Sequence, residues 1–197
     1  MASQFIHITL PDGTRKQVPA GCTVREALTP EGGRLDAKVL AAKINGEPMD
    51  LSRPLEQDAT IEPLTFESAE GREVYRHSST HIMAQAVKEV FPTAQLTIGP
   101  ALDDGFYYDF AFDRPFTPED LEKIEARAIE IMKRGLTVTR SELSKQDAIK
   151  FFQERGEGYK VELINSFDDA SPISLYRQGE FVDLCRGPHL PTTGYVG

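Results

Sequence analysis

The residues best suited to chemistry fall into two short motifs, which hold three of the four histidines and one of the two cysteines. His77 and His81 stand four residues apart, and on a helix this spacing places both imidazoles on one face, one turn apart. Cys185 and His189 are also four residues apart, but the Gly and Pro between them predict a turn. Together these four side chains could ligate one tetrahedral metal ion. Each motif alone is more typical of a surface helix face or a core thiol, whereas the combination indicates a site.

Three further polar residues strengthen this interpretation. Tyr108 falls in a predicted strand, Lys160 at the start of another, and Asp183 two residues before Cys185. Side chains alternate along a strand, so Asp183 and Cys185 should point to the same side. Taken singly, Tyr108 is typical of core packing and Lys160 of a solvated charge. A tyrosine, a lysine and an aspartate converging on imidazoles and a thiol predict a reaction site.

The elements that must position these residues form a larger α+β unit. Residues 67–71 are polar and read as a linker. Helices are expected at residues 73–90, from Thr117 onward and from Ser144 to about Gly156. Strands are expected at residues 95–98, 106–112, 136–139, 160–164 and 180–184. The helix from Thr117 should bury one face, whose members step by three and four residues: Leu121, Ile124, Ala128 and Ile131.

A smaller unit precedes it, from about Gln4 to Leu64. Strands are expected at residues 5–10, 15–18, 39–44 and 59–61. Thr23 begins a capping box that should open a short helix, and Asn45-Gly46 is a strong signal for a tight hairpin. His7 alternates with two isoleucines and should face solvent. These signals predict a small sheet crossed by one helix, without a catalytic constellation.

Composition restricts the class of protein. The chain has 197 residues, of which 40% are hydrophobic and 27% charged, as in ordinary globular proteins. No apolar run approaches the length of a membrane span, and the first ten residues lack a signal-peptide pattern, so we expect a cytoplasmic protein. Two cysteines in unlike surroundings suit a reducing compartment. With 22 basic and 31 acidic residues the net charge is −9. Any contact with RNA must therefore use a small basic patch on the protein or involve only one end of the RNA chain.

Motifs in both units resemble known families. The first unit resembles a TGS domain, a ubiquitin-like β-grasp module, in residues 9–13, the hairpin at Asn45-Gly46-Glu47 and residues 58–61. The second resembles the editing domain of threonyl-tRNA synthetases, and alanyl-tRNA synthetases carry a related editing fold. The quoted motifs are His77-Ser78-Ser79-Thr80-His81, Ile98-Gly99-Pro100, Gly105-Phe106-Tyr107-Tyr108-Asp109, Gly158-Tyr159-Lys160-Val161 and residues 182–189. The predicted organisation is a TGS-like domain at residues 1–66 and an editing domain at residues 67–197.

The resemblance implies a deacylase that hydrolyses seryl-tRNA(Thr) at the aminoacyl ester. It implies catalytic roles for His77, Lys160, Asp183 and Cys185, and substrate binding by His81, Tyr108 and His189. Metal binding by His77, His81, Cys185 and His189 remains an alternative, with zinc as the candidate ion and with the balance towards no tightly bound zinc. Truncating His77 or Lys160 should affect the rate more than folding.

The implied partners are the aminoacylated 3′ end of tRNA(Thr) and the synthetic core of the same enzyme, because a complete synthetase would continue beyond Gly197. A membrane partner is not expected. Three alternatives stay open: a structural zinc module in an RNA-binding protein, an interaction module whose working part is the TGS-like unit, and a free-standing editing protein.

Overall fold

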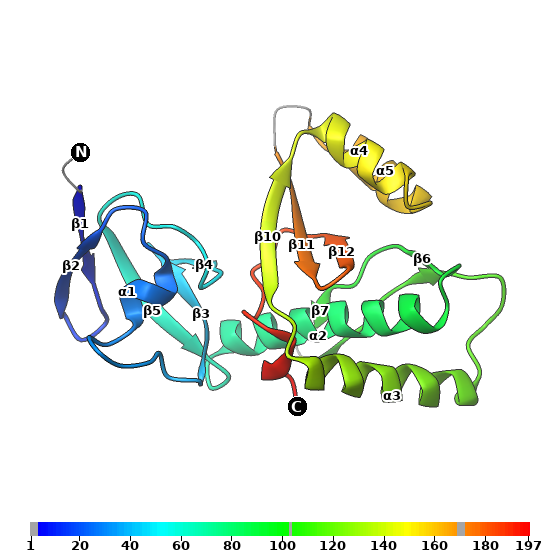
Figure 1. Ribbon diagram of the computed structural model, residues 1–197, viewed down its shortest axis with the longest axis horizontal. Coiled ribbons are helices and arrows are strands. Elements are labelled where there is room, and N and C mark those ends of the chain that lie inside the picture. The colour runs from blue at the N-terminus through cyan, green and yellow to red at the C-terminus, as the bar shows by residue number, and fades with distance from the viewer. Residues whose placement is uncertain (1–3, 103, 169–171) are drawn as a thin grey trace. The chain divides into compact units, whose positions relative to one another are not determined.

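The computed structural model describes residues 4–102, 104–168 and 172–197. Met1–Ser3 of the predicted first domain and Asp103 of the second lie outside the described residues. The chain divides into two compact units: unit 1 runs to Tyr75 and includes Gly187–Pro191, and unit 2 comprises Arg76–Arg186 and Thr192–Gly197. Figure 1 shows the elements of both units. In the described residues, no helix is long and apolar enough to cross a membrane.

Unit 1 is a β-grasp fold, as the sequence predicts. Its described strands form one sheet in the order β2-β1-β5-β3-β4, in which β1 and β5 are parallel and the other pairs are antiparallel. The strands are β1 Phe5–Thr9, β2 Arg15–Pro19, β3 Val39–Ile44, β4 Glu47–Met49 and β5 Ala59–Thr65. Helix α1 (Val24–Leu28) contributes Val24, Ala27 and Leu28 to the same core as Ile8 and Ile61.

Local chemistry explains why these elements form where the sequence predicts them. The Thr23 hydroxyl accepts a hydrogen bond from the Glu26 amide, and the Glu26 carboxylate accepts one from the Thr23 amide, so the predicted capping box is present. Asn45 and Gly46 have φ values of 52° and 92°, the left-handed pair that a tight hairpin requires. His7 is exposed, as expected from its alternation on β1.

Unit 2 is a mixed α+β structure built on two long helices and a small sheet. Helix α2 (Ala69–Val90) and helix α3 (Pro118–Arg134) lie side by side (Figure 1). They share a core that includes Ile82, Val87, Ile124 and Ile131. Strands β10 (Val138–Leu143), β11 (Ile173–Gln178) and β12 (Phe181–Leu184) form an antiparallel sheet. Helices α4 (Lys145–Gln153) and α5 (Gly158–Asn165) pack on this sheet through Phe152 and Ile164.

Short two-stranded ribbons and a final turn complete unit 2. Strand β6 (Gln95–Leu96) pairs with β9 (Phe110–Ala111), and β7 (Ala101–Leu102) pairs with β8 (Gly105–Phe106). A 3-10 turn, η1, covers Thr193–Tyr195. The expected strand at residues 106–112 is therefore interrupted, and Tyr108 lies between β8 and β9.

Several predicted elements are wrong in type or extent. Residues 160–164 form part of helix α5 rather than a strand, because Glu157, Lys160 and Ile164 are buried at helical steps of three and four residues. Helix α2 begins at Ala69, so most of the predicted linker at residues 67–71 is helical or leads into the helix. Leu121 is 56% exposed, so the buried face of α3 is shorter than predicted. The expected strand at residues 136–139 is longer and shifted, and β11 has no predicted counterpart.

Candidate functional site

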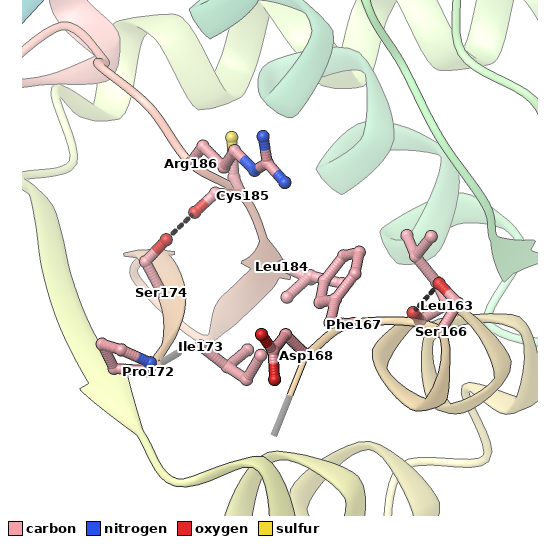
Figure 2. Close-up of a pocket in the computed structure, with 10 residues that line it drawn as sticks. All are labelled: Leu163, Ser166, Phe167, Asp168, Pro172, Ile173, Ser174, Leu184, Cys185 and Arg186. Atoms are coloured by element: carbon pink, nitrogen blue, oxygen red, sulfur yellow. Dashed lines mark hydrogen bonds between the residues drawn. The ribbon is translucent and has the colours of Figure 1, made fainter. Parts of the chain in front are cut away.

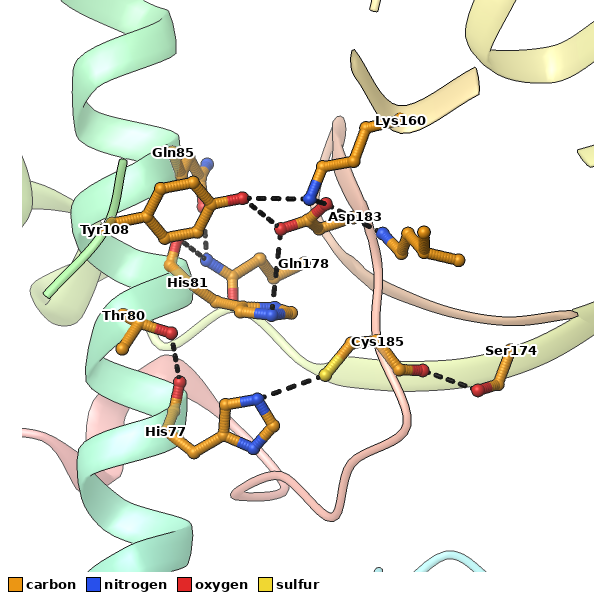
Figure 3. A network of polar contacts seen from close by, with 11 residues as sticks. His77, Thr80, His81, Gln85, Tyr108, Lys160, Ser174, Gln178, Asp183 and Cys185 are labelled. Atoms are coloured by element: carbon orange, nitrogen blue, oxygen red, sulfur yellow. Dashed lines mark hydrogen bonds and ion pairs between the residues drawn. The ribbon is translucent and has the colours of Figure 1, made fainter. Parts of the chain in front are cut away.

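One face of α2 presents a series of polar side chains to the rest of unit 2. His77, His81, Gln85 and Lys88 step by four, four and three residues along this face, the spacing of one helical stripe. The side chains of His81 and Gln85 are buried, although both are polar. Figure 3 shows the first three of these residues facing partners from β11, β12 and the segment after β12. We refer to His77, His81, Gln85 and Lys88 as the polar stripe of α2.

A thiol and two imidazoles meet at one end of this stripe. Cys185 follows β12, and its Sγ lies 3.1 Å from Nε2 of His77 (Figure 3). The rings of His77 and His81 are 5.7 Å apart between centroids, in an edge-to-face arrangement. The ligand atoms of His77, His81 and Cys185 lie within 4.8 Å of one another. His77 and Cys185 are half-buried, so solvent reaches this part of the site.

A buried ion pair lies beside the imidazoles. Lys160 Nζ is 2.7 Å from Asp183 Oδ1, and the two side chains are 3% and 2% exposed. The Tyr108 hydroxyl donates to Asp183 Oδ2 at 2.6 Å, and Lys160 Nζ donates to the Tyr108 hydroxyl oxygen at 3.1 Å. His81 Nε2 lies 3.8 Å from the same Oδ2 atom. Buried charges persist only when they are paired and hydrogen-bonded, and these contacts meet that condition for Lys160 and Asp183.

Burial sets the protonation states of two members of the group. Desolvation lowers the pKa of His81 to about 3, an effect that Asp183 opposes and that His77 and Lys160 reinforce. His81 is therefore a neutral imidazole at pH 7, the form that can accept a hydrogen bond or ligate a metal. Desolvation and the negative charge of Asp183 raise the pKa of Tyr108 well above its usual value of 10. Tyr108 therefore stays protonated and serves Asp183 as a donor.

The structure brings together six of the seven residues singled out in the sequence: His77, His81, Tyr108, Lys160, Asp183 and Cys185. Lys160 comes from a helix rather than a strand. It is buried against Asp183, so the expectation that its truncation affects the rate more than folding does not hold for Lys160. The seventh residue, His189, lies in the Gly187–Pro191 segment of unit 1, where its backbone amide donates to Asp50 Oδ1 at 2.8 Å. A shared role for His189 with the other six stays a prediction.

Sequence reasoning did not identify four polar residues that support this group. Gln178 of β11 donates through Nε2 to Gln85 Oε1 at 2.8 Å and to the His81 carbonyl oxygen at 3.2 Å. Lys88 and Glu157 form an ion pair with a separation of 2.7 Å between Nζ and Oε1. The spacing from His77 could have placed Gln85 and Lys88 on the same helix face. Nothing comparable in the sequence indicates Gln178 or Glu157.

A glycine fixes the position of Tyr108. A Cβ atom at Gly99 would lie 2.2 Å from Cδ2 of the Tyr108 ring. Phe110 stacks on the same ring with a centroid distance of 4.8 Å. The Ile98-Gly99-Pro100 motif thus has a physical reason, because Gly99 allows the tyrosine ring to lie against the backbone.

A cavity of about 590 Å³ adjoins Cys185 (Figure 2). Apolar side chains line it, among them Leu163 of α5, Phe167 just after α5 and Leu184 of β12, and Ser174 and Arg186 add polar atoms. Ser174 Oγ donates to the Cys185 carbonyl oxygen, which ties β11 to the segment that carries the thiol. The volume lies within the range of small-molecule sites in proteins.

The comparisons with known proteins agree with the motifs in the sequence. The TGS domain model matches residues 6–65, and the model of the threonyl and alanyl tRNA synthetase second additional domain matches residues 173–197. A threonine–tRNA ligase from Symbiobacterium thermophilum is 53% identical over 194 residues, which cover 98% of this chain and 30% of that protein. One from Geobacter sp. (strain M21) is 51% identical, over 97% of this chain and 30% of its own length. One from Acidithiobacillus ferrooxidans is also 51% identical, over 96% of this chain and 30% of its own length.

These matches confirm the resemblance to threonine–tRNA ligases that the motifs predict, and the TGS match agrees with the β-grasp fold of unit 1. The chain spans about 30% of the length of these relatives.

Proposed function

We propose, on the premise that this chain corresponds to the TGS-containing region of threonine–tRNA ligases, that unit 2 hydrolyses the ester of tRNA(Thr) wrongly charged with serine. The observation that carries the proposal is the arrangement of half-exposed His77 and Cys185 beside the buried group of Lys160, Asp183, Tyr108 and His81. The second-additional-domain match at residues 173–197, which includes Asp183 and Cys185, supports it.

A separate hydrolytic site is useful because a single binding pocket selects threonine over serine only weakly. Serine is smaller than threonine by one methyl group, so a pocket for threonine cannot exclude it by size. The missing methyl contact is worth about 1–3 kcal/mol, or roughly 10- to 200-fold. A second site that admits serine and clashes with the methyl group of threonine multiplies this selectivity. The aminoacylated 3′ end of tRNA(Thr) is therefore the proposed substrate, and the synthetic core of such a ligase the proposed partner.

The chemistry of each side chain, and the exposure of His77, suggest the roles in hydrolysis. His77 lies where solvent reaches, so it is the proposed group for activating or positioning the attacking water. Asp183 and Tyr108 are the proposed contacts for the ammonium and hydroxyl groups of serine. The charge of Lys160 is proposed to stabilise negative charge that develops on the ester or to contact the terminal ribose. Hydrolysis of an activated ester needs no covalent intermediate, so Cys185 is proposed to shape the pocket with His81 and His189 rather than to act as nucleophile.

Zinc remains an alternative feature of the same site. The donor types of His77, His81 and Cys185 fit zinc, their ligand atoms are close enough, and His81 is neutral as a ligand must be. With His189 they would supply four ligands. A zinc ion held there would act as a Lewis acid or lower the pKa of a bound water. The roles given above to His77, Asp183 and Lys160 do not depend on it.

The test is hydrolysis of seryl-tRNA(Thr) and threonyl-tRNA(Thr) by this chain, measured side by side at equal enzyme concentration. We expect faster loss of serine by roughly tenfold to a few hundredfold, the selectivity that an overpacked methyl group gives. His77→Ala should abolish most of this activity, whereas His7→Ala, which removes an exposed histidine of unit 1, should not change it. Equal rates on the two substrates, or no hydrolysis of serine at high enzyme concentration, would refute the proposal.

A structural zinc module is the second candidate, because His77, His81 and Cys185 could hold an ion with no catalytic role. It predicts stoichiometric zinc and no deacylation. An interaction module centred on the TGS domain predicts instead that neither His77→Ala nor Lys160→Ala changes any measured property of binding.

A further inference from the structure

Glu157 is a buried carboxylate that the proposed chemistry does not use. It directly precedes α5 and is 4% exposed. Its two oxygens have different partners: Oε1 lies 2.7 Å from Lys88 Nζ, and Oε2 accepts a hydrogen bond from the Leu96 amide at 2.9 Å. A carboxylate can serve both partners, whereas an amide side chain has only one acceptor oxygen. The charge and both oxygens of Glu157 are therefore needed where it stands.

Lys88 is equally well matched to this position. Its Nζ contacts Glu157 and also donates to the carbonyl oxygens of Pro92 at 2.9 Å and Ala94 at 2.8 Å. An ammonium group has three donors, so these three acceptors account for all of them. Lys88 is the last member of the polar stripe of α2, two turns beyond His81. The ion pair thus joins the helix that carries both imidazoles to the start of α5.

Helix α5 carries Lys160 three residues after Glu157. At 1.5 Å per residue, the two positions are separated by about 4.5 Å along the helix, less than one turn. A shift of the start of α5 therefore moves Lys160 by a similar amount. Lys160 must stay within hydrogen-bond distance of both Asp183 Oδ1 and the Tyr108 hydroxyl, at 2.7 and 3.1 Å.

We propose that the Glu157–Lys88 ion pair sets the position of Lys160 relative to Asp183 and the imidazoles of α2. Glu157 and Lys88 are then positioning residues, which touch no substrate and act through Lys160. The effect on rate rests on the proposed deacylase function, whereas the effect on Lys160 itself does not.

The kinetic test is a double-mutant cycle. Glu157→Gln keeps the shape of the side chain but cannot accept from Lys88 and Leu96 together, so we expect the single-turnover rate of seryl-tRNA deacylation to fall roughly ten- to a hundredfold. In a Lys160→Ala background the same change should have no further effect on the rate, because the residue through which it acts is gone. The loss of thermal stability caused by Glu157→Gln should be seen both with Lys160 present and in the Lys160→Ala background. A fall in rate of the same factor in both backgrounds would overturn the proposal.

Two control variants separate positioning from loss of stability. Asp120→Asn removes another buried, ion-paired carboxylate, at the start of α3, and should lower stability without changing the rate per folded molecule. Glu142→Gln removes an exposed partner of Arg140 on β10 and should change neither. If Glu157→Gln does not fold, Lys88→Met with Glu157→Leu removes both charges together, so that no buried charge is left without its partner. The rate should stay low in this double variant, and full recovery of the rate would overturn the proposal.

A readout without substrate makes the two proposals separable. The ¹⁵Nζ nuclear magnetic resonance signal of Lys160, assigned by its absence in Lys160→Ala, reports the contacts of this ammonium group directly. Glu157→Gln and the Lys88→Met, Glu157→Leu pair should shift this signal or speed its proton exchange, and Asp120→Asn should not. A chain without deacylase activity but with these shifts would refute the proposed function and keep the positioning role. An unchanged Lys160 signal in both variants would refute the positioning role, whatever the activity.

Discussion

Gly99→Ala is the substitution that most directly tests whether the geometry around Tyr108 matters. The added methyl carbon would lie 2.2 Å from Tyr108 Cδ2 and 2.8 Å from Cγ and Cε2. Ordinary carbon contacts are about 3.5–4.0 Å, so the ring must move by more than about 1 Å. Gly99 does not have a positive φ, so alanine introduces no backbone strain of its own.

The displaced ring cannot keep its present contacts. Tyr108 is buried and stacks on Phe110, and its hydroxyl is 2.6 Å from Asp183 Oδ2. A movement of more than 1 Å carries the hydroxyl out of good hydrogen-bond geometry with Asp183 and with Lys160. Overpacking of this kind costs about 1–3 kcal/mol of stability. A misplacement of about 1 Å at a reaction site costs up to about a hundredfold in rate.

The assay is single-turnover deacylation of seryl-tRNA(Thr), with the folded fraction of each variant measured by near-ultraviolet circular dichroism. Gly105→Ala is the matched control, because a Cβ at Gly105, on the neighbouring strand β8, meets no atom within 4 Å. We expect Gly99→Ala to lose at least tenfold in rate per folded molecule, as Tyr108→Phe should, and Gly105→Ala to lose little. Equal effects of the two glycine variants, or an unchanged rate for Gly99→Ala, would refute the positional role given to Tyr108.

Three further predictions concern other charged residues and the metal. His77→Ala and Lys160→Ala should each cut the rate of deacylation by about a hundredfold. Only Lys160→Ala should also lower the free energy of unfolding in urea, by about 3–5 kcal/mol, because it leaves Asp183 buried without its cation. Equal stabilities of the two variants would contradict the burial argument. Hydrogen bonds from Arg114 and from the Thr117 amide lower the pKa of Asp120, so the contribution of the ionised Asp120 to stability is present above about pH 4 and is lost as the pH falls towards the lowered pKa. The melting temperatures of Asp120→Asn and the unchanged chain should therefore differ clearly at pH 7 and less at pH 3. A difference that grows on acidification would contradict this. Protein purified without added metal should keep its deacylation in a chelator, and stoichiometric zinc together with loss of activity on chelation would reverse that expectation.

The sequence predicts best those features that local chemistry decides. The capping box at Thr23, the helix start at Thr117, the Ser144 cap and the Asn45-Gly46 hairpin all lie where the sequence places them. Each depends on hydrogen bonds or φ values within about three residues, so the nearby sequence contains the information. The pairing of His77 with His81 is of the same kind, since it needs only a helix.

Features that tertiary packing decides were harder to predict. The run from Lys160 to Ile164 contains β-branched and apolar residues compatible with a strand, and packing against α4 and the sheet selects the helix. Burial of Lys160 depends on a carboxylate in β12 and a hydroxyl between β8 and β9. The Lys88–Glu157 pair joins segments far apart in the sequence, and no motif records it.

The protonation states of the buried group constrain how it can receive a substrate. With His81 neutral and Tyr108 protonated, the charges of Lys160 and Asp183 balance each other before serine binds. In the proposed reaction the ammonium group of serine adds a second positive charge, and Asp183 is the carboxylate within this group that can balance it. A protonated His81, 3.8 Å from that carboxylate, would add one more positive charge beside it, so the desolvation that keeps His81 neutral limits the positive charge that the ammonium group of the substrate meets. The same reasoning makes the position of Lys160 critical: moved closer, it repels the ammonium, and moved away, it leaves Asp183 a buried charge without its cation when no substrate is bound.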